Sequence, residues 1–117
     1  MQVIETGPEL AATIHRFESH GASSVHLGTG TGDAHVYAIH IEPGGEIGPH
    51  EAGFDQLFIV VEGAGWAAGA DGVQIPLDSG RAVIVHRGEI HSKGSETGMK
   101  AIMVQVSALR PPEDAPT

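Results

Sequence analysis

The chain has 117 residues, which is enough for one hydrophobic core, so we expect a single compact domain. Fifteen acidic and six basic residues give a net charge of −9 at pH 7, which disfavours nucleic acids and anionic membranes as partners. The absence of cysteine excludes disulfides, thiolate metal sites and cysteine nucleophiles. Because neither a long apolar run nor a signal-peptide pattern is present, we predict a cytoplasmic protein.

The first third of the chain contains weak secondary-structure signals. The spacing of Leu10, Ile14 and Phe17 fits a short helix, but residues 13–17 also fit an edge strand, and both alternatives stay open. Residues 23–27 predict a short strand. The glycine-rich segment 28–33 predicts a loop, and it resembles a nucleotide-binding loop only superficially, because no lysine and no helix follow it.

Short strands separated by glycine and proline are predicted over the rest of the chain. A strand over residues 34–42 ends at Pro43, and a loop runs from there to about Ala52. Residues 56–62 are apolar at nearly every position, which indicates a strand that is buried on both faces. Further strands are expected at 66–68, 73–76, 81–86 and 99–107, with a turn at 63–65 and a mobile, proline-rich tail over 110–117. This pattern is typical of a β-sandwich or barrel.

Two segments carry glycines and histidines at regular offsets. In the first, Gly44 is followed after five residues by His50, position 52 is Ala52, Gln56 comes four residues later, and Gly63 follows after six more. The second segment contains the following residues in order: Gly80, His86, Gly88, His91 and Ser95. Several of the glycines stand where a chain reversal favours a positive φ.

These segments resemble the two sequence motifs of the cupin superfamily, and the resemblance covers about two thirds of the chain. It implies an all-β fold, a single-domain cupin jelly-roll β-barrel. The conserved barrel would span residues 34–107, with an N-terminal segment, 1–33, that completes it and a flexible tail at 108–117.

The resemblance also implies a reduced metal site. Cupins with intact motifs bind one divalent ion through two histidines and a glutamate of the first motif and a histidine of the second. Carried over, these positions are His50, Ala52, Gln56 and His91, so Ala52 provides no ligand. We predict a metal site of His50, Gln56 and His91 for Fe, Mn, Ni, Cu or Zn, weaker than an intact one. Other candidate ligands, none of them preferred, are His35, His40, Glu51 and His86.

Three functional hypotheses follow, and no catalytic residue is assigned. The first is a metal-dependent small-molecule enzyme, for example an oxygenase, isomerase or lyase. The second is a metal-free, non-catalytic cupin that binds a small organic ligand in its barrel. The third is an interaction domain without a pocket function, because fold alone does not determine function. A purely structural alternative is that His50 and His91 are hydrogen-bonded polar residues of a vestigial cavity.

The strand at 56–62 also suggests an assembly. With Gln56, Phe58 and Val60 facing inward, its other face needs a cover, which the second sheet, the N-terminal segment or another subunit can provide. We hypothesise a symmetric homodimer, which is common in cupins. Trp66 and Phe58 are interpreted as core or interface residues, with an aromatic pocket wall as the alternative. The remaining histidines are expected to be solvated: His15, His20 and His26.

Overall fold

A computed structural model describes residues 1–112, and these form an almost purely β structure, which confirms the predicted fold class. The elements are β1 Gln2–Glu5, η1 Pro8–Leu10, β2 Ala12–Thr13, β3 Ser23–Ser24, β4 Thr29–Ile41, β5 Glu46–Glu51, β6 Asp55–Ala68, β7 Gln74–Asp78, β8 Arg81–Val85, β9 Ile90–Gly94 and β10 Met99–Arg110. Within this part of the chain, no helix is long and apolar enough to cross a membrane. Of the predicted tail at 108–117, residues 108–110 belong to β10, and residues 113–117 lie outside the described residues.

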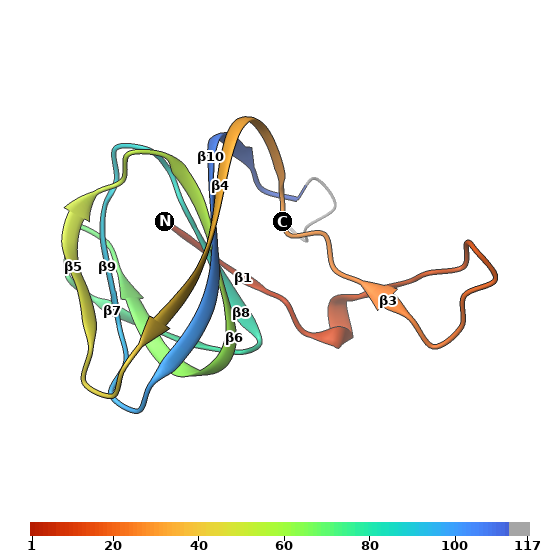
Figure 1. The fold of residues 1–117 in the computed structure, drawn as a ribbon, viewed down its shortest axis with the longest axis horizontal. Helices are drawn as coiled ribbons and strands as arrows, with labels where there is room; N and C mark the ends of the chain where they lie inside the picture. The colour runs from red at the N-terminus through yellow and green to blue at the C-terminus, as the bar shows by residue number, and fades with distance from the viewer. Residues whose placement is uncertain (113–117) are drawn as a thin grey trace.

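The strands form two layers that share β6. The larger sheet has the order β1-β8-β6-β10-β4, and its pairs are antiparallel. The second layer is built from β5, β9, β7 and the C-terminal half of β6. Figure 1 shows the second layer at the left and the larger sheet in the middle, facing each other. Residues 6–28 connect β1 to β4 and project on the opposite side of the larger sheet.

The apolar side chains of β6 alternate between two clusters, as the pattern at 56–62 predicts. Phe58 and Val60 belong to the core between the two layers, where they pack with Val83 and Val85 of β8. Leu57 belongs to a second cluster on the outer face of the larger sheet. The members of this outer cluster and the residues packed on it are Ile4, Leu27, Leu57, Ile59, Ala82, Ile84, Val104, Val106 and Leu109. Part of the N-terminal segment therefore covers part of the outer face.

Several predicted boundaries are wrong, each for a physical reason. The segment 28–33 is no loop, because Thr29 to Thr31 pair with β10 beyond a bulge. The loop predicted up to Ala52 contains β5, and β9 was not predicted at all. The turn predicted at 63–65 is absent, since β6 continues through it from one layer to the other with a register shift. The undecided segment near the N-terminus forms η1 and β2.

The motif glycines have the backbone conformation that the sequence indicated. Gly44, Gly63 and Gly88 have φ angles of 80°, 81° and 91°, in the region that side chains rarely adopt. Gly63 also lies where β6 passes from one sheet to the other, and a Cβ there would meet the carbonyl oxygen of Gly98 at 2.3 Å. Glycine at this position thus allows the close approach of β6 to the β9–β10 turn.

Candidate functional site

The two histidines predicted as ligands face each other between paired strands. His50 on β5 is the register partner of His91 on β9, and their ring centroids are 4.3 Å apart. Residues opposite each other in an antiparallel pair share a face, so both side chains lie on the barrel side of the second layer. The predicted residues His50 and His91 are therefore brought together. His91 is buried, whereas His50 is exposed.

Gln56, the third predicted residue, is connected to His91 by a lysine that the sequence analysis missed. Lys93 Nζ donates a hydrogen bond to Gln56 Oε1 at 2.7 Å and lies 2.9 Å from His91 Nδ1. The Lys93 side chain is only 1% exposed, and its Nζ lies 4.8 Å from the centre of the Phe58 ring. Since Lys93 follows His91 by two residues on one strand, both point into the barrel.

The hydrogen-bond partners determine which nitrogen of each imidazole carries a hydrogen. His50 Nδ1 lies 2.8 Å from the carbonyl oxygen of Gly48, which can only accept, so Nδ1 donates and Nε2 of the neutral ring is an acceptor. A Lys93 ammonium can only donate, so His91 Nδ1 accepts and His91 Nε2 carries the hydrogen. The site thus presents an acceptor on His50 beside a donor on His91. His91 Nε2 is buried and has no partner within residues 1–112.

Burial shapes the charge of the site. It lowers the pKa of Lys93 to about 8, because the ammonium has left water and only neutral groups are hydrogen-bonded to it among the described residues. Burial also lowers the pKa of His91 to about 4; the neighbouring Lys93 and His50 add to this effect, and Glu89 opposes it. At neutral pH the interior therefore holds a largely cationic Lys93 beside a neutral His91.

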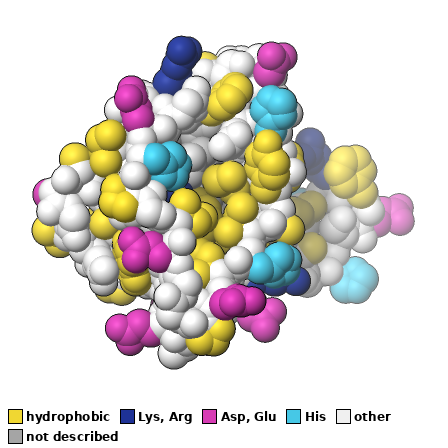
Figure 2. All heavy atoms as spheres, turned by 60° about the vertical axis from the view of Figure 1, so that its left-hand side comes forward, with side chains coloured by type: hydrophobic (Ala, Val, Ile, Leu, Met, Phe, Trp, Pro, Cys, Tyr) yellow, Lys and Arg dark blue, Asp and Glu magenta, His cyan; other side chains and the backbone are white. Residues whose placement is uncertain are grey.

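A row of polar side chains crosses the inner face of the larger sheet next to Gln56. His35 on β4, Gln105 on β10 and Gln56 on β6 are consecutive register partners. His35 is exposed and its ring meets Phe54 edge-on, at 5.5 Å between centroids. Figure 2 shows hydrophobic side chains gathered near the middle of one face, with histidine side chains around them. The exposure of His35, Tyr37 and His50 shows that the inner surface reaches solvent along β4 and β5.

Sequence comparisons reveal no relative: no protein-family model and no curated protein matches the chain. Solved structures do match. A cupin superfamily protein from Desulfitobacterium hafniense is 15% identical, with a TM-score of 0.59 over 70% of this chain and 77% of the other. An RmlC-like cupin from Shewanella frigidimarina is 27% identical, with a TM-score of 0.59 over 64% and 67%. A predicted oxalate decarboxylase from Thermotoga maritima is 21% identical, with a TM-score of 0.57 over 62% and 65%.

The chain has the cupin fold. This confirms the single-domain jelly-roll barrel that the resemblance of the two motifs implied. At these levels of identity the likeness establishes the architecture, whereas the chemistry has to be argued from the residues of this chain.

The residues of this cupin barrel do not suit a divalent ion in the arrangement described. Position 52 is a buried alanine, and Gln56 already accepts a hydrogen bond from Lys93. With an ammonium on its Nδ1, His91 has a hydrogen on Nε2 in place of the lone pair that a metal needs. The Lys93 ammonium would also repel a divalent ion. At a separation of about 6 Å and an effective dielectric constant of about 20, this repulsion amounts to about 5 kcal/mol. Within residues 1–112, no three His, Asp or Glu side chains form a group that could hold a metal.

The substitute ligands considered from the sequence do not complete the set. Glu51 is exposed and pairs with Ile90, on the face opposite to His50. His86 is exposed, with Nδ1 3.7 Å from Asp55 Oδ1. His40 alternates with the inward residues of β4 and so faces outward, whereas His35 faces the barrel.

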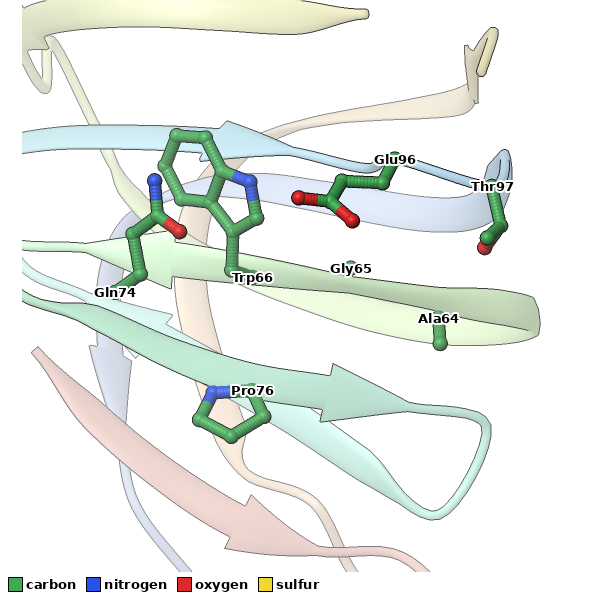
Figure 3. Close-up of a pocket in the computed structure, with 7 residues that line it drawn as sticks. All are labelled: Ala64, Gly65, Trp66, Gln74, Pro76, Glu96 and Thr97. Atoms are coloured by element: carbon green, nitrogen blue, oxygen red, sulfur yellow. The ribbon is translucent and has the colours of Figure 1, made fainter. Parts of the chain in front are cut away.

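The protein also has a surface groove outside the barrel. Trp66 and Glu96 lie on either side of it, with Pro76 below and Gln74 beside the indole (Figure 3). The groove has a volume of about 340 Å³ and lies on the outer surface of the second layer. Trp66 therefore forms a wall of an external groove, while Phe58 is a core residue, as predicted. As the single tryptophan of the chain, Trp66 is a fluorescent reporter outside the barrel site.

Proposed function

We propose that this protein is a metal-free, non-catalytic cupin that binds a small hydroxylated organic acid at the open side of its barrel. The observation that carries the proposal is the buried Lys93 ammonium, hydrogen-bonded to Gln56 and His91 and without a carboxylate partner among the described residues. A buried charge of this kind favours an anion nearby, because the low dielectric constant strengthens the attraction.

The imidazole pair supports the choice of ligand class. His91 Nε2–H is a buried donor without a partner in the described chain, and Lys93 on the opposite nitrogen strengthens it as a donor. A carboxylate oxygen of the ligand would accept from His91. His50 Nε2 is an acceptor, so the same ligand gains a second hydrogen bond when it carries a hydroxyl group beside the carboxylate.

Matched pairs of acids test the proposal by calorimetric titration in buffer that contains a chelator. We expect malate to bind more tightly than succinate, and lactate more tightly than propionate, by about 5- to 10-fold, since one hydrogen bond contributes about 1 kcal/mol. The Lys93→Met variant should lose at least about tenfold in affinity, whereas Lys100→Met, a change of the exposed lysine on β10, should not. No binding of any of these acids, or equal loss in both lysine variants, would contradict the proposal.

The second candidate is a metal-dependent enzyme that uses His50, Gln56 and His91. It is favoured by one observation: His91 Nε2 has no hydrogen-bond partner among residues 1–112, and it is the atom that would face an ion. One structural neighbour is described as a predicted oxalate decarboxylase, so under this candidate a small carboxylate would be the substrate class to test first. This candidate requires Lys93 as a neutral amine, and it predicts that chelator abolishes binding of the acids.

A further inference from the structure

The groove on the outer surface of the second layer is built around the indole of Trp66. On β6, Trp66 is the register partner of Pro76 on β7 and of Gly94 on β9. Because residues opposite each other in an antiparallel pair share a face, these two residues are its neighbours on the same surface. Gly94 leaves the space that the ring occupies, since a Cβ at this position would collide with the indole. The ring is therefore held against the backbone of β9.

The polar groups around the indole lack partners in the described part of the chain. The Glu96 carboxylate lies on the side of the ring nitrogen, and Gln74 lies at the opposite edge of the ring (Figure 3). Both residues are exposed. Within residues 1–112, their side chains and Trp66 Nε1 make no hydrogen bond and no ion pair. The groove thus presents a free donor and a free acceptor next to an aromatic surface.

The charge of the groove disfavours an anionic ligand. None of the described residues that line it is Lys, Arg or His, whereas Glu96 contributes a carboxylate. A phosphate or carboxylate ligand would meet this negative charge without a cation to offset the repulsion. The volume of about 340 Å³ is near the lower end of the range for small-molecule pockets. A small ligand without a negative charge therefore fits best.

The indole N–H and the Glu96 carboxylate together favour a hydroxylated ligand over an ammonium ion. An indole N–H can only donate and a carboxylate can only accept, so a ligand bonded to both must offer an acceptor and a donor. A hydroxyl group offers both, whereas an ammonium would leave the N–H of Trp66 unbonded. The C–H groups of a sugar ring also form an apolar face that can pack on the indole and on Pro76.

We propose that this groove binds a neutral sugar unit, with the sugar ring packed on Trp66 and its hydroxyl groups hydrogen-bonded to Trp66 Nε1 and to Glu96. Gln74 and Thr97 can each donate and accept, so they can bind further hydroxyl groups. Lys93 precedes Gly94 on β9 and points to the other face of the second layer. The sugar site is therefore separate from the barrel site, and it does not depend on the binding of an organic acid there.

Trp66 is the single tryptophan of the chain, so its fluorescence reports binding in the groove directly. The wild-type protein is titrated with the methyl glycosides of glucose, galactose, mannose and N-acetylglucosamine, and with choline and glucose 6-phosphate as charged probes. We expect a saturable change with at least one neutral glycoside. Choline and glucose 6-phosphate should bind at least about tenfold more weakly, because choline offers no acceptor and the phosphate is repelled.

Matched variants locate the site by proton–nitrogen correlation NMR, in which the single indole N–H signal should also shift on binding. Glu96→Gln should weaken the binding of the glycoside by about tenfold, because a hydrogen bond to a charged group is lost. Glu62→Gln is the control, since Glu62 is an exposed glutamate of β6 outside the groove, and it should have no effect. Lys93→Met should bind the glycoside as the wild-type protein does.

The variants are first compared with the wild-type protein by circular dichroism. The absence of a saturable change with all four glycosides overturns the proposal, as does tighter binding of choline or of glucose 6-phosphate. Equal affinity of the wild-type protein and Glu96→Gln, or an equal loss in Glu62→Gln, overturns it as well. Loss of glycoside binding in Lys93→Met places the sugar in the barrel and contradicts a separate site.

Discussion

The Gln56→Glu variant is expected to be more stable than the wild-type protein by about 2–3 kcal/mol at neutral pH. The new carboxylate has the shape of the amide and accepts the same 2.7 Å hydrogen bond from Lys93 Nζ. Lys93 is already desolvated in the wild-type protein, so only the burial of the carboxylate is a new cost. The carboxylate adds a direct charge–charge attraction to a hydrogen bond that the ammonium of Lys93 already donates. Urea denaturation followed by circular dichroism measures the difference.

Gln105→Glu is the matched control for this substitution. Gln105 is the register neighbour of Gln56 on β10, but no hydrogen bond joins it to Lys93. Its replacement should leave the free energy of unfolding unchanged or lower it. If Gln56→Glu is less stable than the wild-type protein, Lys93 is not an uncompensated ammonium and the charge assignment of the site is wrong.

The free energy of unfolding should rise by on the order of 3 kcal/mol as the pH increases from about 8 to 10.5, because of Lys93 alone. Burial lowers the pKa of Lys93 to about 8 in the folded protein, against an ordinary value of 10.5. Between these two values the unfolded chain keeps a proton that the folded chain has released. The free energy of unfolding therefore increases with pH across this window. Below about pH 8 Lys93 is protonated in both states, so it contributes no pH dependence there.

Two variants identify the group responsible for the rise. Lys93→Met has a similar volume without a titrating amine and should abolish the rise, whereas Lys100→Met, at an exposed position, should retain it. Gln56→Glu should shrink it, because a carboxylate raises the pKa of Lys93 towards its ordinary value. A profile that is the same in wild-type and Gln56→Glu proteins would contradict a buried ammonium at this position.

The motif spacing predicted the barrel correctly and named three residues that the structure brings close together, because glycine and histidine positions relate directly to backbone geometry. Gly44 and Gly63 adopt the positive φ angles that the chain reversals suggested, and His50 and His91 meet across β5 and β9. What the motif could not provide is the group that joins Gln56 to His91, the ammonium of Lys93. That group comes from a residue outside the ligand positions.

Lys93 was missed because β9 was not identified as a strand. Ser92, Lys93 and Gly94 are poor strand formers, and no strand was predicted between residues 86 and 99. The i, i+2 relation between His91 and Lys93 was therefore not applied. A lysine two residues after a ligand position was the available signal. The segment forms a strand because its tertiary context overrides propensity: Lys93 pairs with Ala67 and Ile47, and Gly94 leaves room for the Trp66 ring.

The early part of β4 was missed for a related reason. A glycine-rich sequence has little propensity for a strand, but β10 extends beyond a bulge at Val106 to Ala108 and pairs with residues 29–31. The backbone amide of Asp33 also donates to Ser107 Oγ at 3.0 Å. Such long-range pairing is not visible in a local pattern.

The most direct test of the central claim, that a lysine ammonium takes the place of a metal in this cupin barrel, is the divalent metal content of the protein. The protein is purified without chelator, incubated with Fe, Mn, Ni, Cu or Zn ions, passed over a desalting column and measured by mass spectrometry. We predict far less than one ion per chain in the wild-type protein, with no difference in His91→Ala. One tightly bound ion per chain that is lost in His91→Ala would contradict the claim.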